Sequence, residues 1–189
     1  MEKLKTSIVT GKVRLSYAHI WQPTSINEGQ EAKYSVSLII PKSDSKTIDE
    51  IKQAIEEAKV VGLPKFGGKI PPILKTPLRD GDIDRPDDEN YADSYFINAS
   101  CRTRPGIVDR YRKPILNKEE VYSGCYAFVS ISLYAFNNNG NKGIAAGLNN
   151  ILKCADGEPL GGRVSAEQDF AGITFDDEPE IAAAHSFLA

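Results

Sequence analysis

Apolar and polar residues alternate along several stretches of the chain, which is the pattern of a β-strand with one buried face. The cleanest alternation is AKYSVSLIIP, residues 32–41, whose closing proline ends the strand. The same pattern predicts strands over residues 8–20, 95–104 and 125–136. A glycine-rich strand is predicted over 142–154, after a tight turn at NNNGN.

One stretch, DSKTIDEIKQAIEEAKVVG, has the three- and four-residue spacing of an amphipathic helix. Asp44 or Ser45 is expected to cap it, and Gly62 and Pro64 to end it. Its apolar stripe consists of Ile48, Ile51, Ile55 and Ala58. Residues 63–93, rich in Pro, Gly and Asp, are predicted to form a long loop.

The predicted order is strand, strand, helix, strand, strand, strand, with no alternating βα units. This order favours a mainly β fold: a small five-stranded antiparallel barrel with one main helix and long loops. The short stretch 108–115 is either a partner strand or an exposed loop.

The strand over 125–136 carries different side chains on its two faces. Its odd positions are small or aliphatic, whereas its even positions are aromatic or serine. The aromatic residues are either a platform on which nucleic-acid bases stack, or core residues beneath the helix or the long loop. The aromatics on this face are Tyr126, Phe128, Tyr134 and Phe136.

Positive charge is concentrated between residues 101 and 115. The cations of this window are Arg102, Arg104, Arg110, Arg112 and Lys113, with Tyr111 between two of the arginines. Phe96 shares a strand face with Arg102 and Arg104, and Lys12 and Arg14 lie on one face of the first strand. Arginine pairs with phosphates and stacks on bases, so the window predicts a nucleic-acid contact. The alternative is a solvated face paired with acids of the loop RDGDIDRPDDEN.

The net charge of the 189-residue chain is −3, but the acids are unevenly distributed. Residues 164–189 contain six acids and no Lys or Arg, which leaves residues 1–163 at +3. We therefore expect a basic binding domain over 1–163 and an acidic tail over 164–189. The tail is either a partner-docking segment or a solubilising one. The residues proposed for docking are Asp176, Asp177, Glu178, Glu180 and Phe187.

The sequence gives little support for catalysis, and no cofactor is expected. His19 and His185 have no Ser, Cys or Asp pattern typical of a triad. Asp80, Asp82 and Asp84 resemble the start of a calcium loop, but Arg85 and Tyr91 occupy its glycine and glutamate positions, so no metal site is predicted. The absence of a signal peptide or long apolar run favours a cytoplasmic protein that does not bind a membrane.

The run YSGCYAFVSISLYAFNNNGNKGIAAGLNNILKCADGEPLGGR, followed by AEQDF, resembles the phage single-stranded DNA-binding proteins with an OB-fold. The resemblance extends to PLRDGD, YFINAS and the basic window, and so covers most of the chain. It implies a non-catalytic protein that coats and protects single strands during replication and recombination, without sequence preference. The expected DNA-binding residues are the basic-window and strand residues named above together with the four aromatics of 125–136.

Two other hypotheses remain open. The chain is a structural or docking module that recruits replication proteins of phage or host through its tail, or it is a metal-dependent nuclease that uses the acidic loop. A homo-oligomer is also left open.

Overall fold

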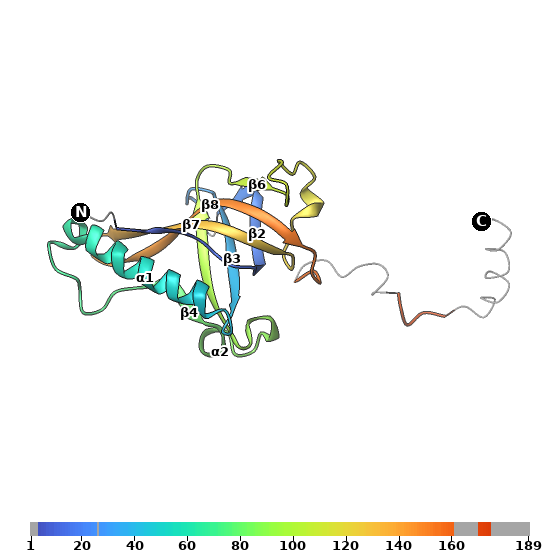
Figure 1. The fold of residues 1–189 in the computed structure, drawn as a ribbon, viewed down its shortest axis with the longest axis horizontal. Coiled ribbons are helices and arrows are strands. Elements are labelled where there is room, and N and C mark those ends of the chain that lie inside the picture. The colour runs from blue at the N-terminus through green and yellow to red at the C-terminus, as the bar shows by residue number, and fades with distance from the viewer. Residues whose placement is uncertain (1–3, 26, 161–169, 175–189) are drawn as a thin grey trace.

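The computed structural model describes residues 4–25, 27–160 and 170–174, and its fold is mainly β (Figure 1). The strands are β1 (Ser7–Val9), β2 (Val13–Thr24), β3 (Lys33–Pro41), β4 (Leu78–Asp80), β5 (Ser94–Cys101), β6 (Gly106–Val108), β7 (Tyr126–Asn138) and β8 (Asn141–Ala155). The helices are α1 (Ser45–Val61) and α2 (Gly81–Asp84), with 3-10 turns η1 (Leu63–Phe66), η2 (Glu89–Tyr91) and η3 (Lys118–Glu120). The predicted mainly β fold with one main helix is confirmed.

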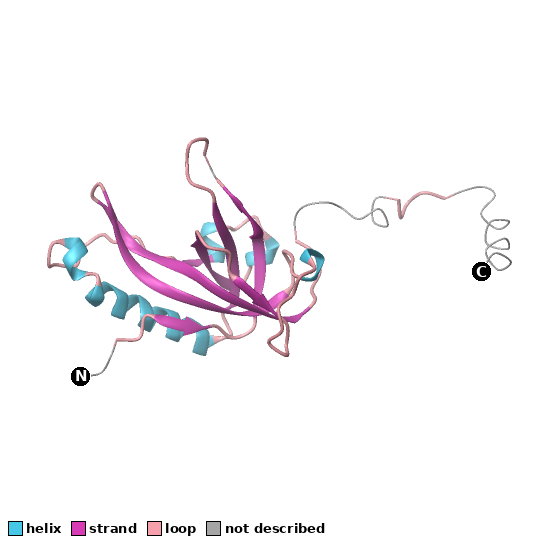
Figure 2. Ribbon diagram, turned by 90° about the horizontal axis from the view of Figure 1, so that it is seen from above, coloured by secondary structure: helices cyan, strands magenta, loops and turns pink. Residues whose placement is uncertain are grey.

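Five strands form a ring in the order β2–β3–β5–β8–β7, and β7 pairs again with β2. The pairings are antiparallel except for β5–β8, which is parallel and short, so the ring is not a regular barrel. The helix α1 lies between the second and third ring strands in the chain and packs along β7 (Figures 1 and 2). The strand ring is OB-fold-like.

The long hairpin of β7 and β8 follows the predicted alternation. The odd positions from Ala127 to Ala135 are buried in the core, while the even positions face outward. Asn139 and Gly140 have φ values of 53° and 88° at the turn, where both central residues of a type I′ turn need a positive φ. The Asn-Gly sequence therefore sets the register of the two longest strands.

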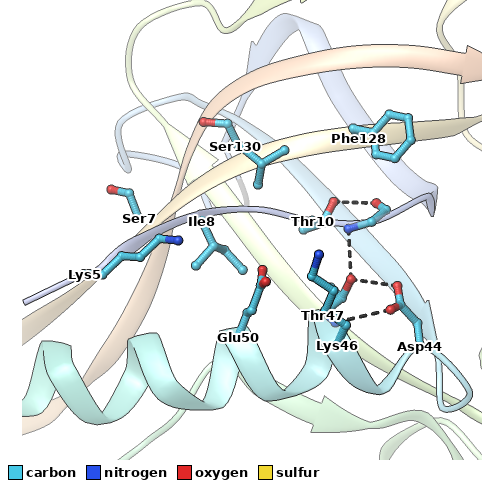
Figure 3. A pocket seen from close by; sticks show the side chains of 12 residues that line it. Lys5, Ser7, Ile8, Thr10, Asp44, Lys46, Thr47, Glu50, Phe128 and Ser130 are labelled. Carbon is cyan, nitrogen blue, oxygen red and sulfur yellow. Dashed lines mark hydrogen bonds between the residues drawn. The ribbon is translucent and has the colours of Figure 1, made fainter.

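The helix α1 begins where the sequence predicted. The Asp44 side chain accepts a hydrogen bond from the Thr47 N–H at 3.2 Å, and the Thr47 hydroxyl donates to Asp44 at 2.7 Å. The same hydroxyl accepts from the Gly11 N–H at 2.9 Å, which ties the helix start to the β1–β2 turn (Figure 3). All four residues of the predicted apolar stripe are buried against the ring.

The single strand predicted over 8–20 is wrong, because the chain turns at Gly11 and forms β1 and β2. A side chain at Gly11 would lie 2.7 Å from the Asp44 carboxylate, so the turn packs against the helix cap. The break shifts the alternation by one residue: Ile8 is buried and Val9 is exposed. The predicted loop 63–93 also contains the short elements β4, α2, η1 and η2.

Beyond β8 the chain crosses the outside of the ring next to Gly124. Gly124 has a φ of 117°, and any side chain there would collide with the Glu158 carbonyl. The Tyr122 hydroxyl donates to the Gly157 carbonyl at 2.9 Å, and the Leu160 N–H donates to the Ser123 carbonyl at 2.9 Å. Residues 156–160 are thereby fixed against the strand ring.

Replacing Gly124 by alanine is expected to lower the free energy of unfolding by about 3 kcal/mol, because backbone strain and a collision with fixed backbone add together. Gly140→Ala is the matched control, since its φ of 88° is also positive but no atom lies within 4 Å of the added Cβ. The control should lose about 1 kcal/mol. Urea denaturation measures the free energy of unfolding of both variants. An equal decrease in the two variants would show that the close approach of Glu158 to Gly124 does not restrict the side chain at position 124.

Candidate nucleic-acid interface

The outer face of β2, β3 and β5 is hollowed. A cavity of about 500 Å³ lies on it, with a floor of small polar side chains. These residues alternate with core residues along β3 and β5, and the strand register pairs Ser35 with Ser100 and Ser37 with Asn98. Small side chains leave room above the sheet, and their hydroxyl and amide groups suit a polar polymer.

The hollow continues toward the end of β5. A second cavity of about 410 Å³ shares Thr24, Ser35 and Ser100 with the first and is also lined by Lys33 and Arg102. We call the two cavities together the sheet groove. It runs across three strands, which is the face by which OB-folds bind oligonucleotides.

Tyr17 projects at one end of the sheet groove because β2 is bulged there. Ser16 pairs with Ser37 and His19 with Ser35, so β2 contains one residue more than β3 over this interval. Tyr17 adopts a φ of 46°, and its side chain is 54% exposed. A bulge that redirects a side chain is a common device beside binding sites. Both Tyr17 and His19 line the groove.

Arg102 lines the other end of the groove, and Arg104 follows it two residues later in the chain without lining either cavity. The Arg102 Nε is 3.2 Å from the Glu31 carboxylate, and both side chains are largely exposed. The Arg104 guanidinium lies 5.2 Å from the ring centre of Trp21, whose indole N–H donates to the Val121 carbonyl at 2.9 Å. Exposed ion pairs and cation–π contacts are weak, so both arginines are available to a phosphate.

The rest of the basic window forms a tight turn after β6, which answers the question left open for residues 108–115. The Asp109 carboxylate accepts hydrogen bonds from the N–H groups of Tyr111 at 2.8 Å and Lys113 at 3.0 Å. Arg112 takes a φ of 65°. Tyr111 is 79% exposed, and the side chains of Arg110, Arg112 and Lys113 are also exposed. These four residues form a projecting tip and line none of the cavities described here.

The predicted stacking residues of β7 face outward, but on another side of the ring. Phe128, 38% exposed, lines a cavity of about 560 Å³ between β1 and α1, together with Lys5 and Lys46 (Figure 3). This cavity shares no lining residue with the sheet groove. Tyr134 is exposed above Gly147, and Phe136 is partly covered as it packs over Gly143. The structure therefore does not bring these aromatics together with Arg102 and Arg104.

Lys12 and Arg14 surround Tyr126, at 4.9 and 5.7 Å from its ring centre. Arg14 also donates hydrogen bonds to the carbonyls of Gly124 at 3.1 Å and Glu158 at 2.6 Å. Its guanidinium therefore holds the segment that follows β8, and only Lys12 of this pair has no hydrogen-bond partner among the described residues.

Phe96 is 2% exposed, so it is not available to stack on a base in this conformation. It packs with Ile39 and Tyr91 in a second small core on the outside of the sheet, against which Leu160 also packs. The alternation of β5 correctly placed Phe96 on the outer face. The residues that cover it come from η2 and from the segment after β8, which the strand pattern does not reveal.

Three acids of the acidic loop are paired with cations within the fold. Lys42 lies 3.0 Å from Asp80 and 2.7 Å from Asp82, and the hydrogen bond from Lys42 lowers the pKa of the Asp82 carboxyl. Arg79 lies 3.6 Å from Asp84. Within residues 4–25, 27–160 and 170–174, no group of three or more His, Cys, Asp or Glu side chains is placed to hold a metal. The helices in that part of the chain are too short or too polar to cross a membrane.

Sequence reasoning missed Tyr17 and Arg85, which line the sheet groove, and Trp21, which contacts Arg104. Tyr17 was read as part of a regular strand, and Arg85 as part of a solvated loop. The helical turn α2 and the turn η2 hold Arg85 over the outer sheet face, where it lines the groove. The predicted docking residues of the tail lie outside the described residues.

A five-stranded OB-like ring with a groove across three strands is typical of the class of folds that bind oligonucleotides or oligosaccharides. Comparison with known proteins identifies the family within this class. The family model described as Enterobacter phage Enc34, ssDNA-binding protein, matches residues 6–181, so the chain belongs to this family.

Individual relatives agree with this assignment. The single-stranded DNA-binding protein of bacteriophage Enc34, solved in complex with ssDNA, is 31% identical with a TM-score of 0.72, over 82% of this chain and 90% of that one. Putative protein p50 of Acyrthosiphon pisum secondary endosymbiont phage 1 is 33% identical over 93% of this chain and 98% of its own length. The gp2.5 protein of bacteriophage T7, 18% identical, shares the fold with a TM-score of 0.60, over 86% of this chain and 99% of that one.

Proposed function

We propose that the protein binds single-stranded DNA in the sheet groove and coats it during phage replication. The observation that carries the proposal is the groove itself. It is continuous across three strands and has a small polar floor, with Arg85 beside the ring of Tyr17 at one end and Lys33 and Arg102 at the other. Its cations suit the phosphates of a strand, and its aromatic rings suit unpaired bases.

The groove favours single strands without sequence preference. A duplex presents no free base faces for stacking, and stacking rings accept every base. The groove floor has no rigid, bidentate arrangement of charged donors of the kind that reads one base. Binding without catalysis is the proposed activity, because Glu31, the acid that lines the groove, is paired with Arg102. The nearby acids Asp80, Asp82 and Asp84 are paired with Lys42 and Arg79.

The projecting tip supplements the groove in this proposal. Arg110, Arg112 and Lys113 add phosphate contacts, and Tyr111 adds one stacking ring, where a strand leaves the groove. The tip is built on β6, which pairs with β8 from Gly106 to Val108. We further propose residues 1–163 as the binding domain and residues 164–189 as an acidic tail that contacts replication or recombination proteins.

Titration with oligo-dT is expected to show tight binding that weakens with salt, with a slope of about 0.7 per phosphate neutralised. Trp21 is the single tryptophan of the chain and lies under Arg104, so its fluorescence should change as DNA recruits that arginine. Duplex DNA of equal length is the control and should bind more weakly. A lack of oligo-dT binding at low salt, or equal affinity for duplex, would reject the proposed function.

A further inference from the structure

Arg85 is surrounded by aromatic rings at the Tyr17 end of the sheet groove. Its guanidinium carbon lies 5.0 Å from the ring centre of Tyr91, 5.1 Å from Phe96 and 5.3 Å from Tyr17. Tyr91 and Phe96 meet edge to face, with ring centres 5.0 Å apart. The electron-rich ring faces attract the cation and fix the plane of the guanidinium.

This cation has no carboxylate within salt-bridge distance among the described residues, although acids surround it in the sequence. Its Nε is buried and has no hydrogen-bond partner. Two of the neighbouring acids have other partners: Asp84 pairs with Arg79, and Asp88 accepts a hydrogen bond from the Asn90 N–H at 3.0 Å. An arginine whose only side-chain contacts are aromatic rings can still bind an anion through its guanidinium group.

The backbone fixes Arg85 and Tyr17 independently of any ligand. The Arg85 N–H donates to the Gly81 carbonyl at 3.0 Å, and the Arg85 carbonyl accepts from the Asp88 N–H at 3.2 Å. At the bulge that carries Tyr17, the next residue, Ala18, donates its N–H to the Ser123 hydroxyl at 2.9 Å. Tyr17 keeps a positive φ, which is costly for a tyrosine and is typical of functional positions.

The groove floor is linked to the same cluster. The Tyr91 hydroxyl donates to the Ser37 hydroxyl oxygen at 3.1 Å in the buried layer beneath the cavity. A polymer lying over Ser37 and Asn98 therefore reaches Arg85 and Tyr17 directly, because all four residues line one cavity.

We propose that Arg85 and Tyr17 form a nucleotide subsite of the groove. One base stacks on the exposed ring of Tyr17, and the phosphate next to it accepts hydrogen bonds from the guanidinium of Arg85. The inference rests on the proposed single-strand binding and adds to it the pair of residues that anchors a nucleotide at this end. Because the cation is in place before DNA arrives, the subsite needs no rearrangement to bind.

The test compares oligo-dT binding by the full chain and by four variants. Arg85→Met, which keeps a long side chain between the rings, is expected to weaken binding about tenfold and to reduce the salt slope by about 0.7. Tyr17→Leu is expected to weaken binding about tenfold with the salt slope unchanged. Tyr17→Phe keeps the ring and should bind like the wild type. Lys69→Met, which removes an exposed cation after η1 outside the groove, should also bind like the wild type.

The salt slope separates a phosphate contact from a purely structural role, since loosening of the ring cluster would weaken binding without changing the number of phosphates neutralised. Unchanged affinity and slope for Arg85→Met, or unchanged affinity for Tyr17→Leu, would overturn the subsite. If Arg85→Met unfolds, Arg85→Lys serves instead: it should keep the slope and lose affinity, and full affinity would count against the planar contact. Failure of the wild type to bind would reject single-strand binding itself.

Discussion

Replacing Arg102 and Arg104 together by glutamine is expected to weaken binding of oligo-dT about 100-fold. Each arginine contributes about 1.5 kcal/mol as a charge-assisted contact to a phosphate, and every 1.4 kcal/mol is tenfold in affinity. The free protein loses little, because Arg102 has only an exposed ion pair with Glu31 and Arg104 only a ring contact. The salt slope should fall by about 1.4, since two phosphates are no longer neutralised.

The matched control is Lys59→Gln with Lys69→Gln, which changes the net charge equally. Lys59 lies on α1 and pairs with Glu56, and Lys69 is exposed in the loop after η1, so neither lines the groove. The control pair should change the affinity by less than about threefold at moderate salt, because separated surface charges are screened. Equal losses from both pairs would mean that overall charge, and not the groove, determines binding.

The fold was largely predictable because its signals are local. The hairpin turn needs positive φ at two successive residues, and Asn139 with Gly140 provides them. The helix is defined by its Asp44 cap and by its apolar stripe. The error at residues 8–20 arose because Gly11 was read as one strand position, whereas it turns the chain against the helix cap.

The binding surface was less predictable because its residues meet through long-range packing. The sequence identified Arg102 and Arg104 from their density in one window, and the structure places Arg102 in the sheet groove. From the sequence, Arg85 is one charged residue of a loop. In the structure, α2 and η2 hold it over Phe96 and Tyr91. Alternation likewise assigned Phe128 to an outer face but could not say that this face adjoins α1 and not the groove.

The last described residue before the acidic tail, Leu160, lies beside the groove. Leu160 shares a cavity of about 320 Å³ with Ser16, Tyr17 and His19, so the chain is fixed at the Tyr17 end at residue 160. Asp176 lies sixteen residues beyond Leu160, and an extended chain of that length spans up to about 50 Å. The four acids at 176–180 therefore can reach either end of the sheet groove, at a high effective concentration.

Deleting residues 174–189 is consequently expected to tighten binding of oligo-dT about tenfold at low salt, because a tethered polyanion no longer competes with DNA for the groove cations. The difference should shrink at high salt, where both polyanions are screened. Replacing Asp176, Asp177, Glu178 and Glu180 by their amides should reproduce the gain at full length, and Phe187→Ala, which keeps every charge, should not change the affinity. Unchanged or weaker binding after truncation would reject competition by the tail and leave single-strand binding intact, since the groove is built entirely from residues before 161.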